Sequence, residues 1–184
     1  MSMSDSPEFL EYVDRFDGLV DDRLEEFRDS PIAARIFTAA SHLGDFSLIW
    51  HIVAAARGVT SDKRAGQALA LSALLGTESL IVNQGIKKLF RRQRPTQSGD
   101  DRFDVRTPST SSFPSGHASS AFFAATVLTY LDGRRSAPLW FGLASVVGTS
   151  RAFVRIHHAS DVIGGAAVGI GLGLLARPLM KTLK

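Results

Sequence analysis

The sequence contains no cysteine, and this absence excludes several kinds of site. Disulfides, thiolate catalysis and zinc or iron–sulfur centres built on cysteine are all ruled out. The chain also lacks a nucleotide-binding glycine loop, an internal repeat and a low-complexity tract. Its net charge of +3 over 184 residues is too small to predict nucleic-acid binding, so no nucleic-acid partner is expected.

A secretory signal peptide is not expected either, because the first thirty residues are acidic and lack a central apolar run. Positions 5–29 hold ten of the 18 acidic residues. Beyond residue 30 the chain is basic and strongly apolar, and the mean hydropathy of the whole chain is +0.07. This division predicts an acidic segment over residues 1–30 and a membrane-embedded body over residues 31–184.

Within the acidic segment, residues 7–28 place apolar side chains at spacings of three and four. This pattern predicts an amphipathic helix with acidic residues on its other face. The first interpretation is a helix that packs on the body of the protein. The alternative is a helix that lies in the membrane interface, although such helices usually carry Lys and Arg on the polar face.

Five apolar stretches follow, at 32–56, 65–86, 117–131, 137–154 and 162–180. A membrane-spanning helix needs about 20 apolar residues, and the second stretch provides them. The third and fifth stretches reach that length only if the polar motifs at their ends are included. We therefore predict an all-α integral membrane helical bundle with five or six membrane helices. A soluble helical bundle is the alternative.

The last apolar stretch contains Gly165, Gly169 and Gly173, each four residues from the next. Such a stripe of small residues lets another helix approach closely. It makes a homo-oligomer, joined through this glycine-striped helix, a candidate assembly.

The connecting segments 58–64 and 132–137 are short, whereas segment 87–116 is long and polar. If the helices alternate in direction, 87–116 and 150–161 lie at the same end of the bundle. The two short loops and the C-terminus are basic, which favours a cytoplasmic location for them and an extracytoplasmic site in a multi-pass plasma-membrane protein. Segment 87–116 is basic too, and this weakens the assignment.

Basic residues crowd the end of the second apolar stretch, in the segment KKLFRRQRP at 87–95. Cations that anchor a helix at the membrane edge explain most of them. Arg94 differs, because Pro95 follows it, ends the helix and biases the Arg94 backbone toward an extended conformation. An arginine with a fixed backbone suits a phosphate, whose oxygens accept two parallel N–H bonds.

The motif Pro-Ser-Gly-His at 114–117 opens the third apolar stretch. Ser115 is a candidate helix N-cap, and capping alone would explain it. A helix N-terminus also presents free N–H groups and a partial positive charge, which suit a phosphate. Gly116 would allow the anion to approach the backbone, and the ring of His117 would lie at the anion.

A third polar cluster consists of Ser150-Arg151, His157 and Asp161. The spacing of four residues predicts a helical turn that brings His157 and Asp161 to one face. The carboxylate could then hold one ring nitrogen of His157 and leave the other as a nucleophile or base. The alternatives are an N-cap role for Asp161 and a membrane-edge anchor role for Arg151.

Together the three clusters fit K-x6-R-P at 87–95, P-S-G-H at 114–117 and S-R-x5-H-x3-D at 150–161. In this order and spacing the chain resembles the type 2 phosphatidic acid phosphatase superfamily. That superfamily groups lipid phosphate phosphatases, polyprenyl pyrophosphate phosphatases, soluble acid phosphatases and vanadium haloperoxidases. The resemblance spans about residues 35–180.

The resemblance implies a metal-independent phosphatase that acts on a lipid or polyprenyl (pyro)phosphate without any cofactor. His157 would attack phosphorus and form a phosphohistidine, Asp161 would orient it, and His117 would protonate the leaving group and then activate water. The residues that would hold the phosphoryl oxygens are Lys87, Arg94, Ser115, Gly116 and Arg151.

Two other functions are compatible with the sequence. A vanadate-dependent haloperoxidase-like enzyme would use the same anion site. A non-enzymatic lipid-binding membrane protein would explain the apolar stretches, but it would not explain why His117, His157 and Asp161 occur together at these spacings.

Four polar residues within the apolar stretches have simpler explanations. His42, Asp45 and His51 are expected to form hydrogen bonds between helices. Glu78 is costly in lipid and is expected to face the interior or a partner, with a role toward the substrate as the alternative.

Overall fold

The computed structural model describes residues 7–96 and 100–183. The helices are α1 (Pro7–Arg28), α2 (Pro31–Gly44), α3 (Leu48–Gly58), α4 (Asp62–Leu80), α5 (Gly116–Asp132), α6 (Ala137–Phe153) and α7 (Ala159–Lys181). The α4 helix continues through a π turn and a 3₁₀ turn as far as Leu89. No strand occurs in the described ranges, which confirms the all-α prediction. Residues 1–6 of the predicted acidic segment lie outside the described residues.

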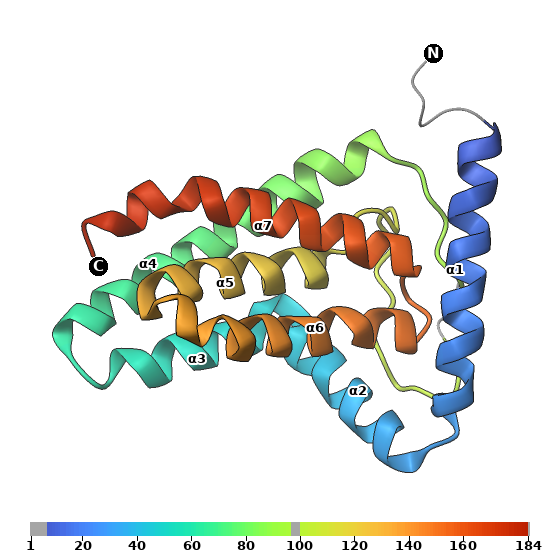
Figure 1. Ribbon diagram of the computed structural model, residues 1–184, viewed down its shortest axis with the longest axis horizontal. Helices are drawn as coiled ribbons and strands as arrows, with labels where there is room; N and C mark the ends of the chain where they lie inside the picture. The colour runs from blue at the N-terminus through green and yellow to red at the C-terminus, as the bar shows by residue number, and fades with distance from the viewer. Residues whose placement is uncertain (1–6, 97–99, 184) are drawn as a thin grey trace.

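Helices α3 to α7 form a bundle in which α5 is central and contacts α4, α6 and α7 (Figure 1). Nearly every side chain of α5 from Ala118 to Leu128 is buried. The core around it includes Trp50, Leu71, Val147 and Met180, each at most 1% exposed. This tight centre fixes the start of α5, where the Pro-Ser-Gly-His motif lies.

Serine residues cap the helices that lead into the site. The Ser30 and Ser115 side chains accept hydrogen bonds from the backbone N–H groups of Ala33 and Ala118, at the starts of α2 and α5. Such caps satisfy amide groups that have no partner within the helix. The predicted N-cap role of Ser115 is therefore confirmed.

The glycine stripe of α7 packs inside the chain, against α5. A Cβ added at Gly169 would lie 2.1 Å from the carbonyl oxygen of Ser119, and one added at Gly165 would lie 2.4 Å from that of Ser115. The two helix backbones therefore touch, as small-residue stripes allow. The stripe is buried and is not available as the oligomer interface that the sequence suggested.

The first apolar stretch, 32–56, is divided between two helices. Phe46 and Ser47 have φ angles of 51° and 60°, in the left-handed region, and they separate α2 from α3. Asp45 lies in this kink. The residues of this kink line the same cavity as His117 and His157.

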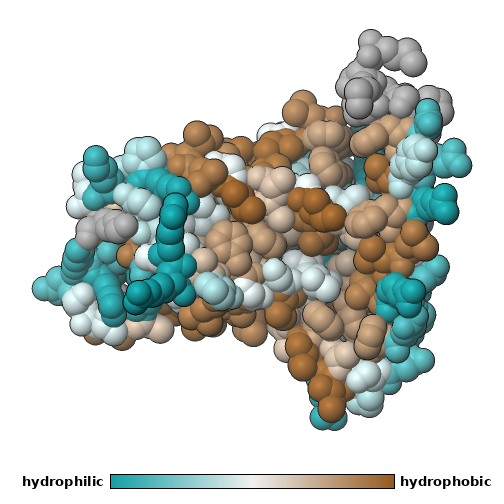
Figure 2. All heavy atoms as spheres, viewed as in Figure 1, coloured by the Kyte–Doolittle hydropathy of each residue, from teal (hydrophilic) through white to brown (hydrophobic). Residues whose placement is uncertain are grey.

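Two helical segments, Asp62–Leu89 and Ala159–Lys181, are long and apolar enough to cross a membrane by length and composition. Helices α5 and α6 have 17 residues each, at the lower end of the range of about 17–25 that spans a bilayer. Large apolar side chains cover the outside of the bundle, among them Leu69, Leu80 and Leu175, each at least 65% exposed. Figure 2 shows this apolar surface.

Helix α1 lies across the end of the bundle where α6 ends and α7 begins (Figure 1). It packs on the body, as the sequence suggested, through a face that mixes apolar side chains such as Leu24 with charged ones. Its most deeply buried side chains are Asp17 and Arg28, whereas Tyr12, Leu19 and Phe27 are more than half exposed. The docking face of α1 is therefore mixed, and its two buried side chains are charged.

Candidate active site

The three polar motifs meet at the α1 end of the bundle, as alternating helices predicted. They surround a cavity of about 340 Å³, and its lining includes Lys87, Gly116, His117 and His157. The kink between α2 and α3 forms another part of the wall. Both predicted catalytic imidazoles therefore face one cavity.

His157 is presented by a tight turn between α6 and α7. The carbonyl oxygen of Arg151 accepts the backbone N–H groups of both Ile156 and His157, at 3.1 and 3.0 Å. Arg155 adopts a left-handed conformation with a φ of 56°, which reverses the chain. His157 therefore precedes α7, and the predicted helical turn from His157 to Asp161 is not formed.

The contacts of the His157 ring assign its tautomer. Its Nε2 lies 3.2 Å from Nη1 of Arg94, and a guanidinium can only donate, so Nε2 is the acceptor and Nδ1 bears the proton. On the Nδ1 side lie the Ser112 hydroxyl at 3.4 Å and Oδ2 of Asp161 at 3.6 Å. Ser112 donates to that same Oδ2 at 2.5 Å. In this structure the lone pair of Nε2 therefore accepts from Arg94, and attack on phosphorus requires this contact to open.

Ser112 is a contact that the sequence analysis missed. It precedes the Pro-Ser-Gly-His motif by two residues, and its position bridging His157 and Asp161 depends on the path of the long loop. No spacing rule within the sequence points to it.

Burial lowers the pKa of His157 well below its usual range, and the nearby guanidinium groups of Arg94 and Arg151 act in the same direction. The ring is therefore neutral at pH 7, which is the state that a nucleophilic imidazole requires.

Asp161 is fully buried within a set of donors. Its Oδ1 accepts from Arg92, and its Oδ2 accepts from the backbone N–H of His158, both at 2.8 Å. Asp161 is the third residue of α7 and bonds back to the cap residue His158, rather than being the N-cap itself. Its orientation toward His157 is thus fixed from several sides.

His117 stands in the first turn of α5, with its Nε2 2.9 Å from Oδ1 of Asp45. Asp45 was expected to bond between helices, and it does so, but its partner is a predicted catalytic residue. Gly44 lets the two elements meet, because a Cβ there would lie 2.6 Å from Cδ2 of His117. The φ of Gly44 is −77°, so the close approach, rather than the backbone conformation, requires glycine.

The other polar residues of the apolar stretches have separate contacts. Nδ1 of His51 lies 3.0 Å from the Ser72 hydroxyl and links α3 to α4 as expected. Glu78 is 2% exposed, accepts a hydrogen bond from the Ser119 hydroxyl and lines the cavity. The prediction that Glu78 faces the interior is confirmed.

Lys87 and Arg151 are buried cations, 5% and 1% exposed. Lys87 reaches only the Thr110 hydroxyl, at 3.5 Å, and Arg151 donates to Ser41 while its Nε and Nη2 find no hydrogen-bond partner in the described part of the chain. Among those residues neither cation has a carboxylate within 4.0 Å. A buried charge normally has a partner of opposite charge, so the two cations Lys87 and Arg151 favour a bound anion as their partner.

Arg94 differs from the predicted phosphate clamp. Its guanidinium donates to the carbonyl oxygens of Pro108, Thr110 and Ile156 at 2.9–3.0 Å, in addition to its contact with His157. The loop that precedes the Pro-Ser-Gly-His motif wraps around this side chain. Arg94 thus lies beside the predicted nucleophile, but its N–H groups hold the loop and are not free to bind two phosphate oxygens.

The start of α5 brings the remaining predicted residues together. A Cβ at Gly116 would lie 3.1 Å from the Asn83 side chain and 3.8 Å from Nζ of Lys87. The backbone N–H of Ser115 donates to the carbonyl oxygen of Asp161 at 3.0 Å. The helix N-terminus, Lys87 and Asp161 are therefore close neighbours.

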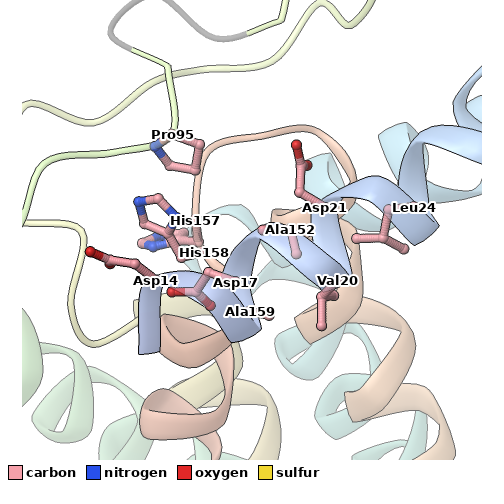
Figure 3. A pocket seen from close by; sticks show the side chains of 11 residues that line it. Asp14, Asp17, Val20, Asp21, Leu24, Pro95, Ala152, His157, His158 and Ala159 are labelled. Carbon is pink, nitrogen blue, oxygen red and sulfur yellow. The ribbon is translucent and has the colours of Figure 1, made fainter. Parts of the chain in front are cut away.

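A second cavity, of about 350 Å³, lies between α1 and the other side of His157 (Figure 3). Its lining includes Asp14, Asp17 and Asp21. The cavity shared by the two imidazoles contains Asp45 and Glu78, but it also has Lys87 and Arg106 in its wall. None of the described residues that line the second cavity is Lys or Arg. The balance of charge therefore favours the cavity of His117 and His157 for an anion.

Comparison with solved structures places this fold. The crystal structure of a transmembrane PAP2 type phosphatidylglycerolphosphate phosphatase from Bacillus subtilis aligns with a TM-score of 0.75 at 22% identity, over 98% of this chain and 90% of that one. Aquifex aeolicus LpxE aligns with a TM-score of 0.70 at 23% identity, over 97% and 99%. At these identities the likeness establishes the fold.

Comparison with characterised sequences adds the activity. The decaprenylphosphoryl-5-phosphoribose phosphatase of Mycolicibacterium smegmatis is 34% identical over 129 residues, which cover 69% of this chain and 68% of that protein. Phosphatidylglycerophosphatase B of Bacillus subtilis is 27% identical over 84% of this chain and 78% of its own length. Fold and relatives together define a membrane phosphatase. Residues 66–184 match the model of the PAP2 superfamily, and the chain belongs to that superfamily.

Proposed function

We propose that the protein hydrolyses a lipid phosphomonoester or a polyprenyl (pyro)phosphate through a phosphohistidine on His157. The observation that supports this most strongly is the cavity that His117 and His157 share, beside buried cations without carboxylate partners. Two imidazoles and the Lys87 ammonium in the wall of one cavity, with Arg151 buried nearby, suit a tetrahedral dianion better than any neutral ligand.

In the first step the lone pair of His157 Nε2 attacks phosphorus, and the bond from phosphorus to the leaving oxygen breaks. The electron pair of that bond goes to the oxygen, which takes a proton from the imidazolium form of His117 and leaves that ring neutral. The ring of His157 becomes positively charged, and Asp161 and Ser112 stabilise it on the Nδ1 side.

In the second step His117 accepts a proton from water, and the hydroxyl attacks the phosphohistidine. The bond from phosphorus to Nε2 breaks, inorganic phosphate leaves, and His157 returns to its neutral form. Lys87, Arg151, Ser115 and Gly116 hold the equatorial oxygens.

Arg94 contributes its positive charge from beside the nucleophile, while its N–H groups hold the loop. These cations, together with the N–H groups at the start of α5, supply the charge stabilisation that Mg²⁺ supplies in other phosphoryl-transfer sites. The reaction is therefore proposed to need no metal, and EDTA should leave the rate unchanged.

The substrate is proposed to be amphiphilic. The cavity lies at the end of the bundle, and the outer surface of the helices below it is apolar. A phosphate head group would occupy the cavity while the tail remains in lipid. The relative named for a decaprenyl-linked phosphoribose makes a prenyl-linked sugar phosphate the first substrate to assay.

The site is proposed to face outward from the plasma membrane, since the opposite end presents the basic short loops. The absence of cysteine allows a direct test. Thr60→Cys and Ser109→Cys place single thiols at exposed positions in segments 58–64 and 87–116. A membrane-impermeant maleimide should label only the second variant in intact cells, and labelling of the first alone would reverse the orientation.

The main test is phosphate release by purified protein from phosphatidic acid, phosphatidylglycerol phosphate, undecaprenyl pyrophosphate and a prenyl-linked phosphoribose. His157→Ala should abolish both turnover and the phosphoenzyme, and vanadate should inhibit the wild type. His117→Ala should slow alkyl phosphates more than activated aryl phosphates. A His157→Ala variant that still turns over would refute the mechanism.

A further inference from the structure

We propose that α1, which lies outside the matched family region, is a positioning helix for the nucleophile. Its Asp17 and Arg28 hold the two helix ends that flank His157, and Asp17 also acts on Asp161 through Arg92. This inference rests on the proposed role of His157. Asp17 and Arg28 are positioning residues, since neither lines the cavity that takes the phosphate.

Asp17 holds the start of α7. Its Oδ1 accepts the backbone N–H of Ser160 at 2.8 Å, and its Oδ2 accepts the Ser160 hydroxyl at 2.6 Å. Ser160 is the second residue of α7, where backbone N–H groups have no partner within the helix. A buried carboxylate at this point also complements the partial positive charge of the helix end. Asp17 thereby fixes the helix that bears Asp161.

Arg28 holds the end of α6 in the complementary way. Its Nε donates to the carbonyl oxygen of Phe153 at 2.8 Å, and its Nη2 donates to that of Ala152 at 3.1 Å. A cation at a helix C-terminus satisfies carbonyl groups that have no partner within the helix. Arg28 is itself balanced by Asp21 and Glu25 of α1, at 2.5 and 2.7 Å.

Arg92 connects α1 to the catalytic carboxylate. Its Nη2 donates to Oδ2 of Asp17 at 2.6 Å, and its Nη1 donates to Oδ1 of Asp161 at 2.8 Å. The other oxygen of Asp161 faces Ser112 and the Nδ1 side of His157. Asp17 positions Arg92, and Arg92 in turn sets the rotation of the Asp161 carboxylate. This rotation determines how Asp161 orients the His157 ring.

The turn between the two helix ends is also tied to α1. Arg155 is the left-handed residue of this turn, and its Nη2 lies 2.8 Å from Asp21 and 3.1 Å from Glu25. A non-glycine residue in this conformation persists where its surroundings hold it there. The whole segment 152–161 is therefore fastened to one face of α1, and Figure 3 shows α1 beside it.

The test compares Asp17→Asn with Asp22→Asn in the full-length protein. Asparagine keeps the size and one acceptor oxygen of Asp17 but removes the charge. Asp22 is exposed on the same helix, so its variant makes the same change of charge away from the site. Arg28→Gln is the second variant, which weakens the hold on α6. The measurements are single-turnover phosphohistidine formation, kcat and KM with para-nitrophenyl phosphate, and the melting temperature.

We expect Asp17→Asn and Arg28→Gln to slow phosphohistidine formation and kcat by about 10- to 100-fold, the effect of displacing a reacting group by about 1 Å. KM should stay within about twofold, because the cations that hold the phosphate are unchanged. Asp22→Asn should match the wild type. A purely structural role would lower the melting temperature without this split between kcat and KM.

Rates within about twofold of the wild type for folded Asp17→Asn and Arg28→Gln would overturn the proposal. Failure of both variants to fold would also overturn it, because α1 would then serve the stability of the fold. A wild type that forms no phosphohistidine would instead refute the proposed mechanism of His157. The two failures are therefore distinguishable.

Discussion

Gly44→Ala tests the position of His117 without replacing any of the proposed catalytic residues. The added Cβ would lie 2.6 Å from Cδ2 of His117 and 3.0 Å from Cγ1 of Val147. The first distance is about 0.8 Å shorter than an ordinary contact of 3.4 Å. Val147 is buried in the core and resists displacement. The imidazole must therefore move away from Asp45 and from the proposed leaving-group position.

A displacement of about 1 Å at a reacting group costs up to about 100-fold in rate, so we expect kcat for an alkyl phosphate to fall about 10- to 100-fold. This corresponds to about 1.4–2.8 kcal/mol of transition-state stabilisation. An activated aryl phosphate, whose leaving group needs little protonation, should lose much less. Overpacking would also lower stability by about 1–3 kcal/mol, which a thermal melt would detect.

Gly142→Ala is the matched control, because a Cβ at that position of α6 meets nothing within 4 Å. The assay is phosphate release from dioctanoyl phosphatidic acid and from para-nitrophenyl phosphate in detergent micelles. Equal losses for the two substrates in Gly44→Ala would refute the role of His117 as the acid. Wild-type rates for both would refute the geometric argument itself.

Three further predictions address other contacts. Ser112→Ala removes the hydroxyl that bridges Asp161 and His157, and we expect phosphohistidine to form about tenfold more slowly. An unchanged rate would show that Ser112 does not act in the site. Gly169→Ala should lower the melting temperature by several degrees or prevent folding, because its Cβ would lie 2.1 Å from a carbonyl oxygen of α5. The control is Gly171→Ala, whose Cβ would meet nothing within 4 Å, and this variant should melt no lower than the wild type. Burial lowers the pKa of His157 well below 6.5, so ¹⁵N NMR should show a neutral ring from pH 7.5 to 5.5, assigned with His157→Ala. The unfolded chain binds this proton at about pH 6.5 and the folded chain does not, so the free energy of unfolding should fall as the pH drops below about 6.5; a ring that titrates near 6.5 would contradict this.

The sequence predicted the part of the site that lies in short contiguous motifs at helix ends. Lys87, His117 and His157 meet at one end of the bundle, because each motif flanks an apolar helix and the helices alternate in direction. Chain order and helix direction are sufficient to predict this convergence. Hydrogen-bond partners that stand far away in the chain need the tertiary structure.

The partner of His117 illustrates that limit. Asp45 is 72 residues away along the chain and reaches the ring only because Phe46 and Ser47 adopt left-handed conformations. Gly44 is a helix-stop signal in the local sequence, so a break near it can be predicted. Neither Phe nor Ser favours the left-handed conformation, so local propensity does not predict how the chain turns there. The close contact between Gly44 and His117 is a tertiary contact and needs the structure.

Helix α1 shows a second limit, which is specific to membrane proteins. Its periodicity correctly predicts a helix with one apolar and one acidic face, but not which face meets the protein. In water, burial of apolar surface decides that question in favour of the apolar face. Next to a bilayer several apolar side chains can be exposed without that cost, and the arginines around His157 attract acidic residues to a docking face that Leu24 shares. Asp17 is therefore buried while Phe27 is exposed, and charge pairing with Arg92 and Arg155 determines how the helix docks.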